Sequence, residues 1–255
     1  MRADQLLVER GLAASRSQAQ RLIAAGVRWR VPPGDWKAVT KNGDELRETV
    51  ELELLDTAES RFVSRGGLKL DGALTHCGLD VTGQRCLDVG QSSGGFTDCL
   101  LQRGAARVVG VDVGQGQLHP KLRAESRVVC MEKCNARELT AEQLVEAGGE
   151  DAAAPFDLIV GDLSFISQTL VWPAIVPLLK EGGHLLMLVK PQFELQPEHI
   201  GKGGLVKDVA SYALVRERIA QACVDRGLTL RDYFESAITG GDGNREFFIW
   251  AKRSA

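Results

Sequence analysis

The chain has 255 residues, 44% of them hydrophobic and 25% charged, which is the composition of an ordinary folded protein with a sizeable core. Its 31 Lys and Arg residues against 34 Asp and Glu residues give a formal net charge of -3, so binding to a polyanion would need a local basic patch. The longest uncharged stretch, residues 163–179, is interrupted by polar residues and prolines. It is shorter than the roughly 20 apolar residues that a membrane-spanning helix needs, which argues against a pore-forming protein.

The N-terminus and the cysteines favour a cytoplasmic protein. The first residues, Met1 to Asp4, lack the apolar run of a signal peptide, so we expect a cytoplasmic location and reduced thiols. The six cysteines contain no C-x-x-C pair and the four histidines are scattered, so we expect no metal. Cys130 and Cys134 could supply at most half of a metal site, and small buried hydrophobic residues are the favoured interpretation.

The first sixty residues are divided by charge. Residues 1–30 carry six arginines against Asp4 and Glu9, whereas residues 31–60 carry more acids than bases. Such a division is typical of a small unit with one basic face. That face could bind a polyanion, or, alternatively, it could simply be exposed to solvent.

Apolar spacing in the basic half predicts two short helices joined by a tight turn. Ser15 is a credible N-cap of the second helix, and Gly26 is a credible stop. That helix would present Arg16, Gln20 and Arg21 to solvent, as a cationic surface suited to phosphate groups. Alternating residues further along the chain predict two short strands.

Several short motifs in this segment are similar to those of an S4 RNA-binding domain, over roughly residues 1–55. They are R-x-D-x-x-L from Arg2, Gly11-Leu12, Ser15-Arg16, Ala19, Leu22-Ile23 and Ala25-Gly26. The resemblance implies a small α+β fold that binds RNA. Residues 28–33 depart from the usual V-x-V-N-G turn of such domains. We place the boundary near residue 60, with 1–60 as the S4-like domain and linker and 61–255 as the larger domain.

From residue 85 onward, short apolar segments alternate with stretches of helical length. This spacing predicts an α/β fold of the Rossmann-like type, with a mostly parallel sheet wrapped by helices. Such sheets bind ligands at the carboxyl ends of their strands. The expected strands are Cys86 to Val89, Val108 to Val111, Val128 to Met131, Leu158 to Val160, Leu185 to Val189, Tyr233 to Ile238 and Phe247 to Trp250.

A glycine-rich loop follows the first of these strands and reads G-x-S-x-G-G from Gly90, not the G-x-G-x-x-G of dinucleotide enzymes. Asp88 beside the loop would repel a pyrophosphate but suits a cationic or amine-bearing ligand. Asp112 ends the next strand, where a carboxylate can accept hydrogen bonds from the hydroxyls of a ribose. This ordered pair of aspartates favours S-adenosylmethionine (SAM), with a dinucleotide as the alternative. The Gly-Lys segments elsewhere do not fit a P-loop, which disfavours ATP.

Four charged residues stand where a merely solvated charge would be unusual. Lys69 follows a Gly-Gly-Leu segment, Asp162 ends a strand, Lys190 ends an apolar run before a proline, and Glu246 leads into an apolar strand. A lysine at the end of a buried strand either extends to solvent or takes part in chemistry. The four together favour chemistry more than any one of them does alone.

Five motifs together resemble the TlyA (haemolysin A-like) family, in which an S4 domain is fused to an FtsJ-like rRNA methyltransferase domain. The motifs are G-G-L-K-L at 66–70, D-V-G-Q-S-S-G-G-F-T at 88–97, G-D-L-S-F-I-S at 161–167, V-K-P-Q-F-E at 189–194 and N-R-E-F at 244–247. The resemblance runs essentially end to end and implies methylation of a ribose 2′-hydroxyl of ribosomal RNA, with SAM as the methyl donor. Two departures, Gln91 and residues 114–118, both touch the expected cofactor pocket.

The resemblance also implies roles for individual residues. A K-D-K-E tetrad falls on Lys69, Asp162, Lys190 and Glu246, which are the expected catalytic residues. The expected cofactor contacts are Asp88 near the amino-acid end of SAM, Asp112 on its ribose, Asn135 at its adenine edge, and Gly90, Ser92, Gly94, Gly95 and Phe96 in the loop. The expected RNA contacts are Arg2, Arg16, Gln20, Arg21 and Arg65, together with Phe165 and Phe193, which would stack on a flipped nucleotide or, alternatively, pack in the core.

A ribose hydroxyl is a poor nucleophile at neutral pH, so an enzyme must favour the loss of its proton and align it with the methyl group. We expect Lys190 to be central, with a pKa lowered by Lys69 and by burial, so that it accepts the proton or stabilises the developing alkoxide. Asp162 and Glu246 would position the two lysines.

Two other functions are alternatives to an enzyme. The first is a methyltransferase-like domain that only binds RNA. The second is a membrane-active cytolysin, which the lack of an amphipathic or spanning segment disfavours.

Overall fold

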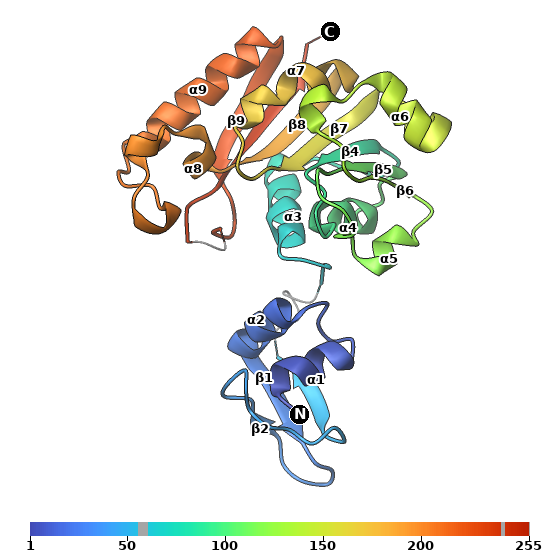
Figure 1. Ribbon diagram of the computed structural model, residues 1–255, viewed down its shortest axis with the longest axis vertical. Coiled ribbons are helices and arrows are strands. Elements are labelled where there is room, and N and C mark those ends of the chain that lie inside the picture. Colours follow the sequence, from blue (N-terminus) through green and yellow to red (C-terminus); the bar gives the residue numbers. More distant parts are fainter. Residues whose placement is uncertain (56–60, 241–242, 255) are drawn as a thin grey trace. The chain divides into compact units, whose positions relative to one another are not determined.

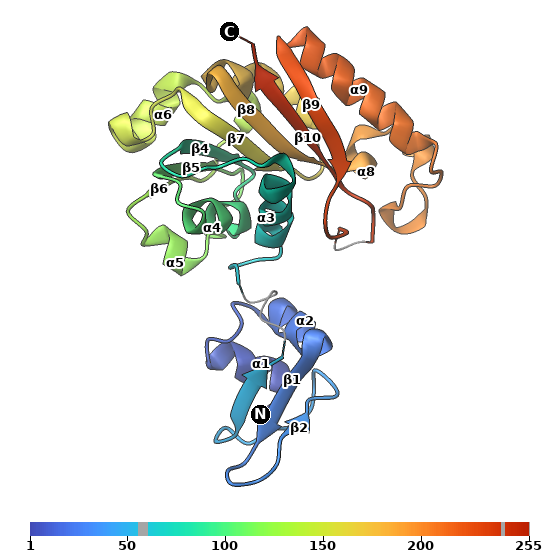
Figure 2. The same cartoon turned by 180° about the vertical axis from the view of Figure 1, so that it is seen from behind.

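The computed structural model of the protein describes residues 1–55, 61–240 and 243–254 (Figures 1 and 2). The chain divides into two compact units, which are Met1–Leu68 (unit 1) and Lys69–Ala255 (unit 2). The division falls after the predicted boundary near residue 60, because Phe62 belongs to unit 1. Phe62 is buried, and its backbone oxygen accepts a hydrogen bond from Gln18 Nε2 (3.2 Å).

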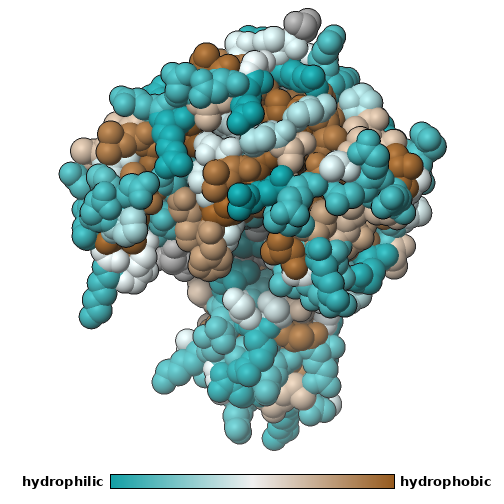
Figure 3. All heavy atoms as spheres, turned by 45° about the horizontal axis from the view of Figure 1, so that its top comes forward, coloured by the Kyte–Doolittle hydropathy of each residue, from teal (hydrophilic) through white to brown (hydrophobic). Residues whose placement is uncertain are grey.

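The described residues of unit 1 form two complete helices and a small antiparallel sheet. The helices are α1 (Ala3–Glu9) and α2 (Arg16–Gly26), and the strands are β1 (Val27–Arg30), β2 (Lys37–Ala38) and β3 (Glu51–Leu54), in the order β2-β1-β3. Ser15 caps α2 as predicted, since its side chain accepts a hydrogen bond from the Gln18 backbone N–H. Leu6, Leu7 and Leu22 are central to its apolar core. The visible face of this smaller unit is mainly hydrophilic (Figure 3).

Unit 2 is built on a seven-stranded sheet in the order β6-β5-β4-β7-β8-β10-β9. The first five strands in this order run parallel, and β10 runs antiparallel to both β8 and β9. The mostly parallel α/β sheet predicted from the sequence is therefore confirmed. The strands are β4 (Arg85–Val89), β5 (Arg107–Val111), β6 (Val128–Met131), β7 (Phe156–Asp162), β8 (Leu179–Val189), β9 (Leu228–Glu235) and β10 (Phe247–Arg253).

One predicted strand lies several residues from its observed position. We expected Tyr233 to Ile238, whereas β9 spans Leu228–Glu235. The alternation Leu228, Leu230 was less conspicuous in the sequence than the aromatic residues that follow it. Pairing with β10 sets the true register, since Phe247 lies opposite Glu235 and Arg253 lies opposite Leu228.

Helices cover both faces of this sheet (Figures 1 and 2). On one face lie α3 and α4, and on the other lie α6, α7 and α9. Trp172, Ile219 and Leu144 pack into the apolar cluster on the second face. The helices of unit 2 are α3 (Gly66–Cys77, which begins in unit 1), α4 (Gly95–Gln102), α5 (Pro120–Arg123), α6 (Ala141–Gly148), α7 (Trp172–Ile175), α8 (Pro191–Glu194) and α9 (Ser211–Asp225).

Candidate active site and cofactor pocket

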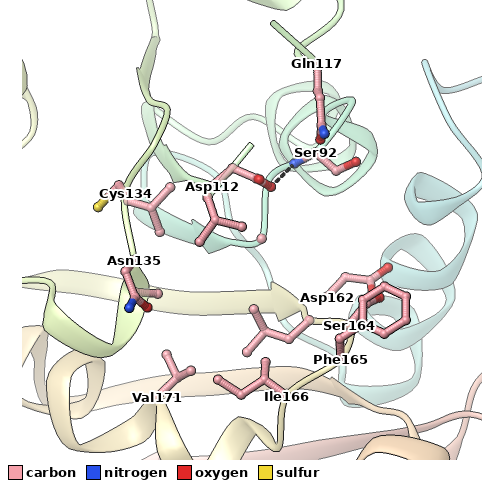
Figure 4. Close-up of a pocket in the computed structure, with 15 residues that line it drawn as sticks. Ser92, Asp112, Gln117, Cys134, Asn135, Asp162, Ser164, Phe165, Ile166 and Val171 are labelled. Carbon is pink, nitrogen blue, oxygen red and sulfur yellow. Dashed lines mark hydrogen bonds between the residues drawn. The ribbon is translucent and has the colours of Figure 1, made fainter. Parts of the chain in front are cut away.

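A pocket of about 380 Å³ opens at the carboxyl ends of the parallel strands (Figure 4). A volume in this range suits a small-molecule ligand. Its walls come from the segments that follow β4, β5, β6 and β7, so residues far apart in the sequence meet there. They are Gly90, Ser92, Val111, Asp112, Val113, Gln117, Cys134, Asn135, Ala136, Asp162, Leu163, Ser164, Phe165, Ile166 and Val171.

Gly90 leaves bare backbone at this pocket. Its φ is 82°, and a Cβ atom there would lie 2.6 Å from the Asp162 backbone oxygen. Both facts require glycine, because other residues rarely adopt this conformation and a side chain has no room. Gly94, with a φ of 94°, instead forms the N-cap of α4 and lies outside the residues that line the pocket.

Asp112 lies at the end of β5 and faces the pocket (Figure 4). Its Oδ2 accepts a hydrogen bond from the Ser92 backbone N–H (2.7 Å), and its Oδ1 accepts one from Gly114 (2.7 Å). Each carboxylate oxygen has a further lone pair, so Asp112 can still accept hydrogen bonds from two hydroxyls. Asn135 also lines the pocket, where its side chain accepts a hydrogen bond from the Arg137 backbone N–H (3.2 Å).

Asp88 lies beneath the loop, outside the residues that line the pocket. Its side chain is fully buried, and its Oδ2 accepts a hydrogen bond from Thr97 Oγ1 (2.7 Å). Burial raises the pKa of this carboxyl to about 7, and the charges of Asp162 and Asp112 add to the effect. Asp88 thus holds the first turn of α4, and its expected place near the amino-acid end of SAM stays a prediction.

The remaining loop residues also serve packing. Phe96 is buried and stacks on Phe248, with ring centroids 6.3 Å apart, so it faces the sheet and not the pocket. Gly95 is buried in the same turn. Gln91 is buried too and donates a hydrogen bond from Nε2 to Thr97 Oγ1 (2.9 Å). Gly110 makes room for it, since a Cβ atom there would lie 2.0 Å from the Gln91 side chain.

The four charged residues singled out in the sequence form two ion pairs in unit 2. Lys190 Nζ lies 2.5 Å from Asp162 Oδ1 and donates a hydrogen bond to Ser164 Oγ (2.9 Å). Lys69 Nζ lies 2.5 Å from Glu246 Oε2, and both side chains are nearly fully buried. Each ammonium therefore faces a carboxylate.

Strand register explains why these residues meet. Phe247 of β10 lies opposite Val189 of β8, so Glu246 and Lys190 occupy neighbouring positions just beyond the ladder. Asp162 ends β7 opposite Leu188 of β8. Three of the four residues thus come from adjacent strand ends. The Asp162–Lys190 pair borders the pocket, because Asp162 and Ser164 are part of its wall.

Phe165 projects at the same end of the pocket (Figure 4). The residue is 90% exposed and its φ is 64°, a conformation that costs energy for a non-glycine residue. It contacts Phe193 with ring centroids 5.1 Å apart. Core packing, the alternative raised for Phe165, is therefore wrong, since nearly all of the ring faces solvent.

Glu194 holds the segment that carries Phe165, a role that the sequence did not indicate. It is buried, and its Oε2 accepts a hydrogen bond from Ser167 Oγ (2.5 Å) while its Oε1 accepts one from the Gln168 backbone N–H (2.9 Å). Burial raises the pKa of this carboxyl. Its presence in the V-K-P-Q-F-E motif was a signal, but its partners lie 26 and 27 positions away.

Comparison with known proteins identifies the family. The FtsJ-like methyltransferase family matches residues 62–253. A 16S/23S rRNA (cytidine-2′-O)-methyltransferase, TlyA of Mycobacterium tuberculosis, is 42% identical over 98% of this chain and 89% of its own length. The chain belongs to the FtsJ-like methyltransferase family.

Two solved structures extend the comparison. One, from Streptococcus thermophilus and described as a candidate hemolysin, is 38% identical and covers 100% of this chain and 88% of its own, with a TM-score of 0.75. The other, an S-adenosylmethionine dependent methyltransferase from Mesorhizobium loti, is 16% identical, covers 71% of this chain and 96% of its own, and has a TM-score of 0.52. The second likeness shows the fold alone.

In this FtsJ-like methyltransferase, the basic residues predicted in unit 1 gather around one acid. Arg2 contacts both oxygens of Asp4 (3.0 and 3.1 Å), and Arg16 (3.0 Å) and Gln20 (3.4 Å) contact Oδ2. Arg21 lies apart from this cluster and donates a hydrogen bond to Ser17 Oγ (3.0 Å).

Arg65 differs from these surface arginines. Its side chain is half-buried, and within the described part of the chain its buried Nε has no hydrogen-bond partner. Its contact with RNA stays a prediction. Among the helices described, none is both long enough and apolar enough to cross a membrane.

Proposed function

We propose that this protein transfers a methyl group from SAM to a ribose 2′-hydroxyl of ribosomal RNA, and that unit 1 binds the RNA. The observation that carries the proposal is the Asp162–Lys190 ion pair at the edge of the pocket, where a reacting hydroxyl could meet a bound methyl donor. The activity for which the M. tuberculosis relative is named supports the same reaction. A ribosomal substrate would place the protein in the cytoplasm.

The residues at the pocket fit SAM. The bare backbone at Gly90 allows close approach of a ligand, and Asp112 can accept hydrogen bonds from the two hydroxyls of its ribose. The pocket also contains Asn135 beside Ala136, where an adenine edge would find hydrogen-bonding groups. When bound, SAM supplies an electrophilic methyl group on a positively charged sulfur, and the carboxylates of Asp112 and Asp162 complement that charge.

Lys190 is the group placed to act on the ribose oxygen. Its ammonium pairs with Asp162 and donates a hydrogen bond to Ser164 Oγ, which limits its freedom and leaves N–H donors for a further acceptor. A donor restricted in this way stabilises negative charge on the oxygen as its proton leaves. The Asp162 carboxylate, 2.5 Å from Nζ, provides a destination for that proton.

Lys69 of α3 and Glu246, which immediately precedes β10, support this arrangement. Their buried pair is electrically neutral, so it adds no net charge beside the reaction centre. On the RNA side, the exposed ring of Phe165 offers a stacking surface for a nucleotide turned out of its helix. Stacking there would bring the ribose of that nucleotide toward Asp162 and Lys190.

The direct test is to map 2′-O-methyl groups in ribosomal RNA from cells with and without the gene. The proposal predicts at least one ribose methylation that disappears with the gene and returns with the wild-type protein, but not with a Lys190→Ala variant. A binding protein that lacks activity would leave the methylation map unchanged, and this result would reject the proposed reaction.

A further inference from the structure

A negative charge lies at the centre of the basic face of unit 1. Asp4 is fully buried beneath Arg2, Arg16 and Gln20, and every one of these side chains donates a hydrogen bond to it. An acid at this place is unexpected, because it opposes the attraction of a polyanion.

The negative charge of Asp4 is buried, whereas the positive charges of the two arginines are exposed. The Asp4 side chain is 0% exposed, whereas 44% of the Arg2 side chain and 54% of the Arg16 side chain are exposed. A partner therefore meets the guanidinium groups and not the carboxylate, and two arginines with one aspartate leave a net positive charge. The hydrogen bonds from Arg2, with those from Arg16 and Gln20, hold the pKa of Asp4 well below its usual range.

The contacts also restrict the arginines. An arginine side chain free in solvent loses rotamer freedom when it binds a phosphate, which weakens binding. Arg2 precedes α1 and Arg16 opens α2, so a single carboxylate fixes the spacing between the first turns of two helices. A guanidinium has five N–H donors, and Asp4 receives only two from Arg2 and one from Arg16.

We infer that Asp4 is a positioning residue for RNA recognition, which holds Arg2, Arg16 and Gln20 as a fixed array that receives neighbouring phosphates of an RNA backbone. The inference rests on the proposed function, in which unit 1 binds ribosomal RNA. Charge alone predicts that removing this acid strengthens RNA binding. The inference predicts that removing it weakens RNA binding.

The test measures binding of the full chain to 16S and 23S rRNA transcripts, at several salt concentrations, for wild type, Asp4→Asn and Glu9→Gln. Glu9 is exposed at the end of α1, so Glu9→Gln makes the same change of charge on the same helix without touching the array. We expect Asp4→Asn to lose about 5- to 10-fold in affinity with a shallower salt dependence, and Glu9→Gln to bind as well as wild type or slightly better. Unchanged or tighter binding by a folded Asp4→Asn protein would overturn the inference.

Two further variants separate positioning from folding. In an Arg2→Ala/Arg16→Ala background, Asp4→Asn should weaken binding much less than in wild type, since only Gln20 is left for the acid to position. A purely structural role predicts the same loss again. If Asp4→Asn fails to fold, Arg16→Lys keeps the charge at an exposed site but removes the guanidinium. We expect the RNA affinity of Arg16→Lys to fall about 3-fold, and unchanged affinity would reject the inference.

The same measurements distinguish this inference from the proposed function. If wild type binds neither transcript, or if Arg2→Ala/Arg16→Ala binds as wild type does, unit 1 is not the RNA-binding part and the proposed function fails there. If the double arginine variant loses affinity while Asp4→Asn does not, the RNA-binding role stands and only the role of Asp4 is rejected.

Discussion

At the residue scale, Asp88 is a fully buried acid. Only one of its oxygens has a hydrogen-bond partner within the described residues, and its pKa is raised to about 7 by burial. The protonated and ionised forms are therefore both populated near neutral pH. The folded protein is consequently less stable when the acid is ionised.

Replacing Asp88 with Asn tests the raised pKa of Asp88 through the pH dependence of the protein's stability. The carboxyl has an ordinary pKa of 3.8 in the unfolded chain and about 7 in the folded protein, so folding favours its protonated form. Its contribution to stability is complete at low pH and is lost as the pH rises through about 7. Between pH 5 and pH 8, urea unfolding should show wild type losing roughly 2 to 3 kcal/mol more than Asp88→Asn. Parallel curves for the two proteins would show that Asp88 ionises normally.

Asp112 is expected to carry much of the affinity for the cofactor. An Asp112→Ala variant loses the acceptor for ribose hydroxyls and the two backbone contacts that hold the loop. We expect SAM affinity to fall about 10- to 100-fold by calorimetry. Glu132→Ala is the matched control, because Glu132 accepts a hydrogen bond from the Gly116 N–H (2.8 Å) in the neighbouring segment but lies outside the residues that line the pocket. Equal losses in both variants would argue against a specific contact of Asp112.

At the scale of the elements, a short helix determines where the stacking ring lies. Glu194 ends α8 and accepts hydrogen bonds from Ser167 and Gln168, and these bonds hold the segment that carries Phe165 in its strained conformation. Arg218 of α9 fixes the same helix by donating a hydrogen bond to the Glu194 backbone oxygen (2.7 Å). Contacts with α8 therefore help to order the segment after β7.

Glu194→Ala should lower methyl transfer through this segment. Its removal leaves the buried Ser167 hydroxyl and the Gln168 N–H without their acceptor, so Phe165 and Ser164 lose their fixed positions. We expect kcat/KM for RNA to fall about 10-fold, with SAM affinity within twofold of wild type and most activity restored in Glu194→Gln. Loss of SAM affinity in step with activity would point to general unfolding instead.

The sheet could be predicted because its strands are apolar runs bounded by turns, and the ends of those runs correctly placed Asp112, Asp162 and Lys190 at strand ends. Contacts set by tertiary packing could not be predicted. Lys69 and Glu246 are separated by 177 positions and meet only because α3 packs beneath the sheet. The same reason explains why Asp88 faces inward: its position in β4 directs its side chain toward Thr97, whereas the motif alone suggested a ligand contact.

At the scale of the whole molecule, the two units carry different chemistry. The net charge of -3 hides a basic face on unit 1 and a pocket in unit 2 that is bordered by carboxylates. These features suit a polyanion and a cation respectively. Recognition of RNA and transfer of the methyl group are therefore expected to respond separately to substitution.

The central claim is that the ion pair at the end of β7 and β8 performs the chemistry, and the same two strands provide its control. Lys180 pairs with Asp157 near the opposite ends of these strands, and neither residue lines the pocket. Transfer of labelled methyl from SAM to ribosomal RNA should fall by about 100-fold or more in Lys190→Ala, with SAM affinity unchanged, and stay near wild type in Lys180→Ala. Full methyl transfer by a Lys190→Ala protein that binds SAM normally would contradict the account.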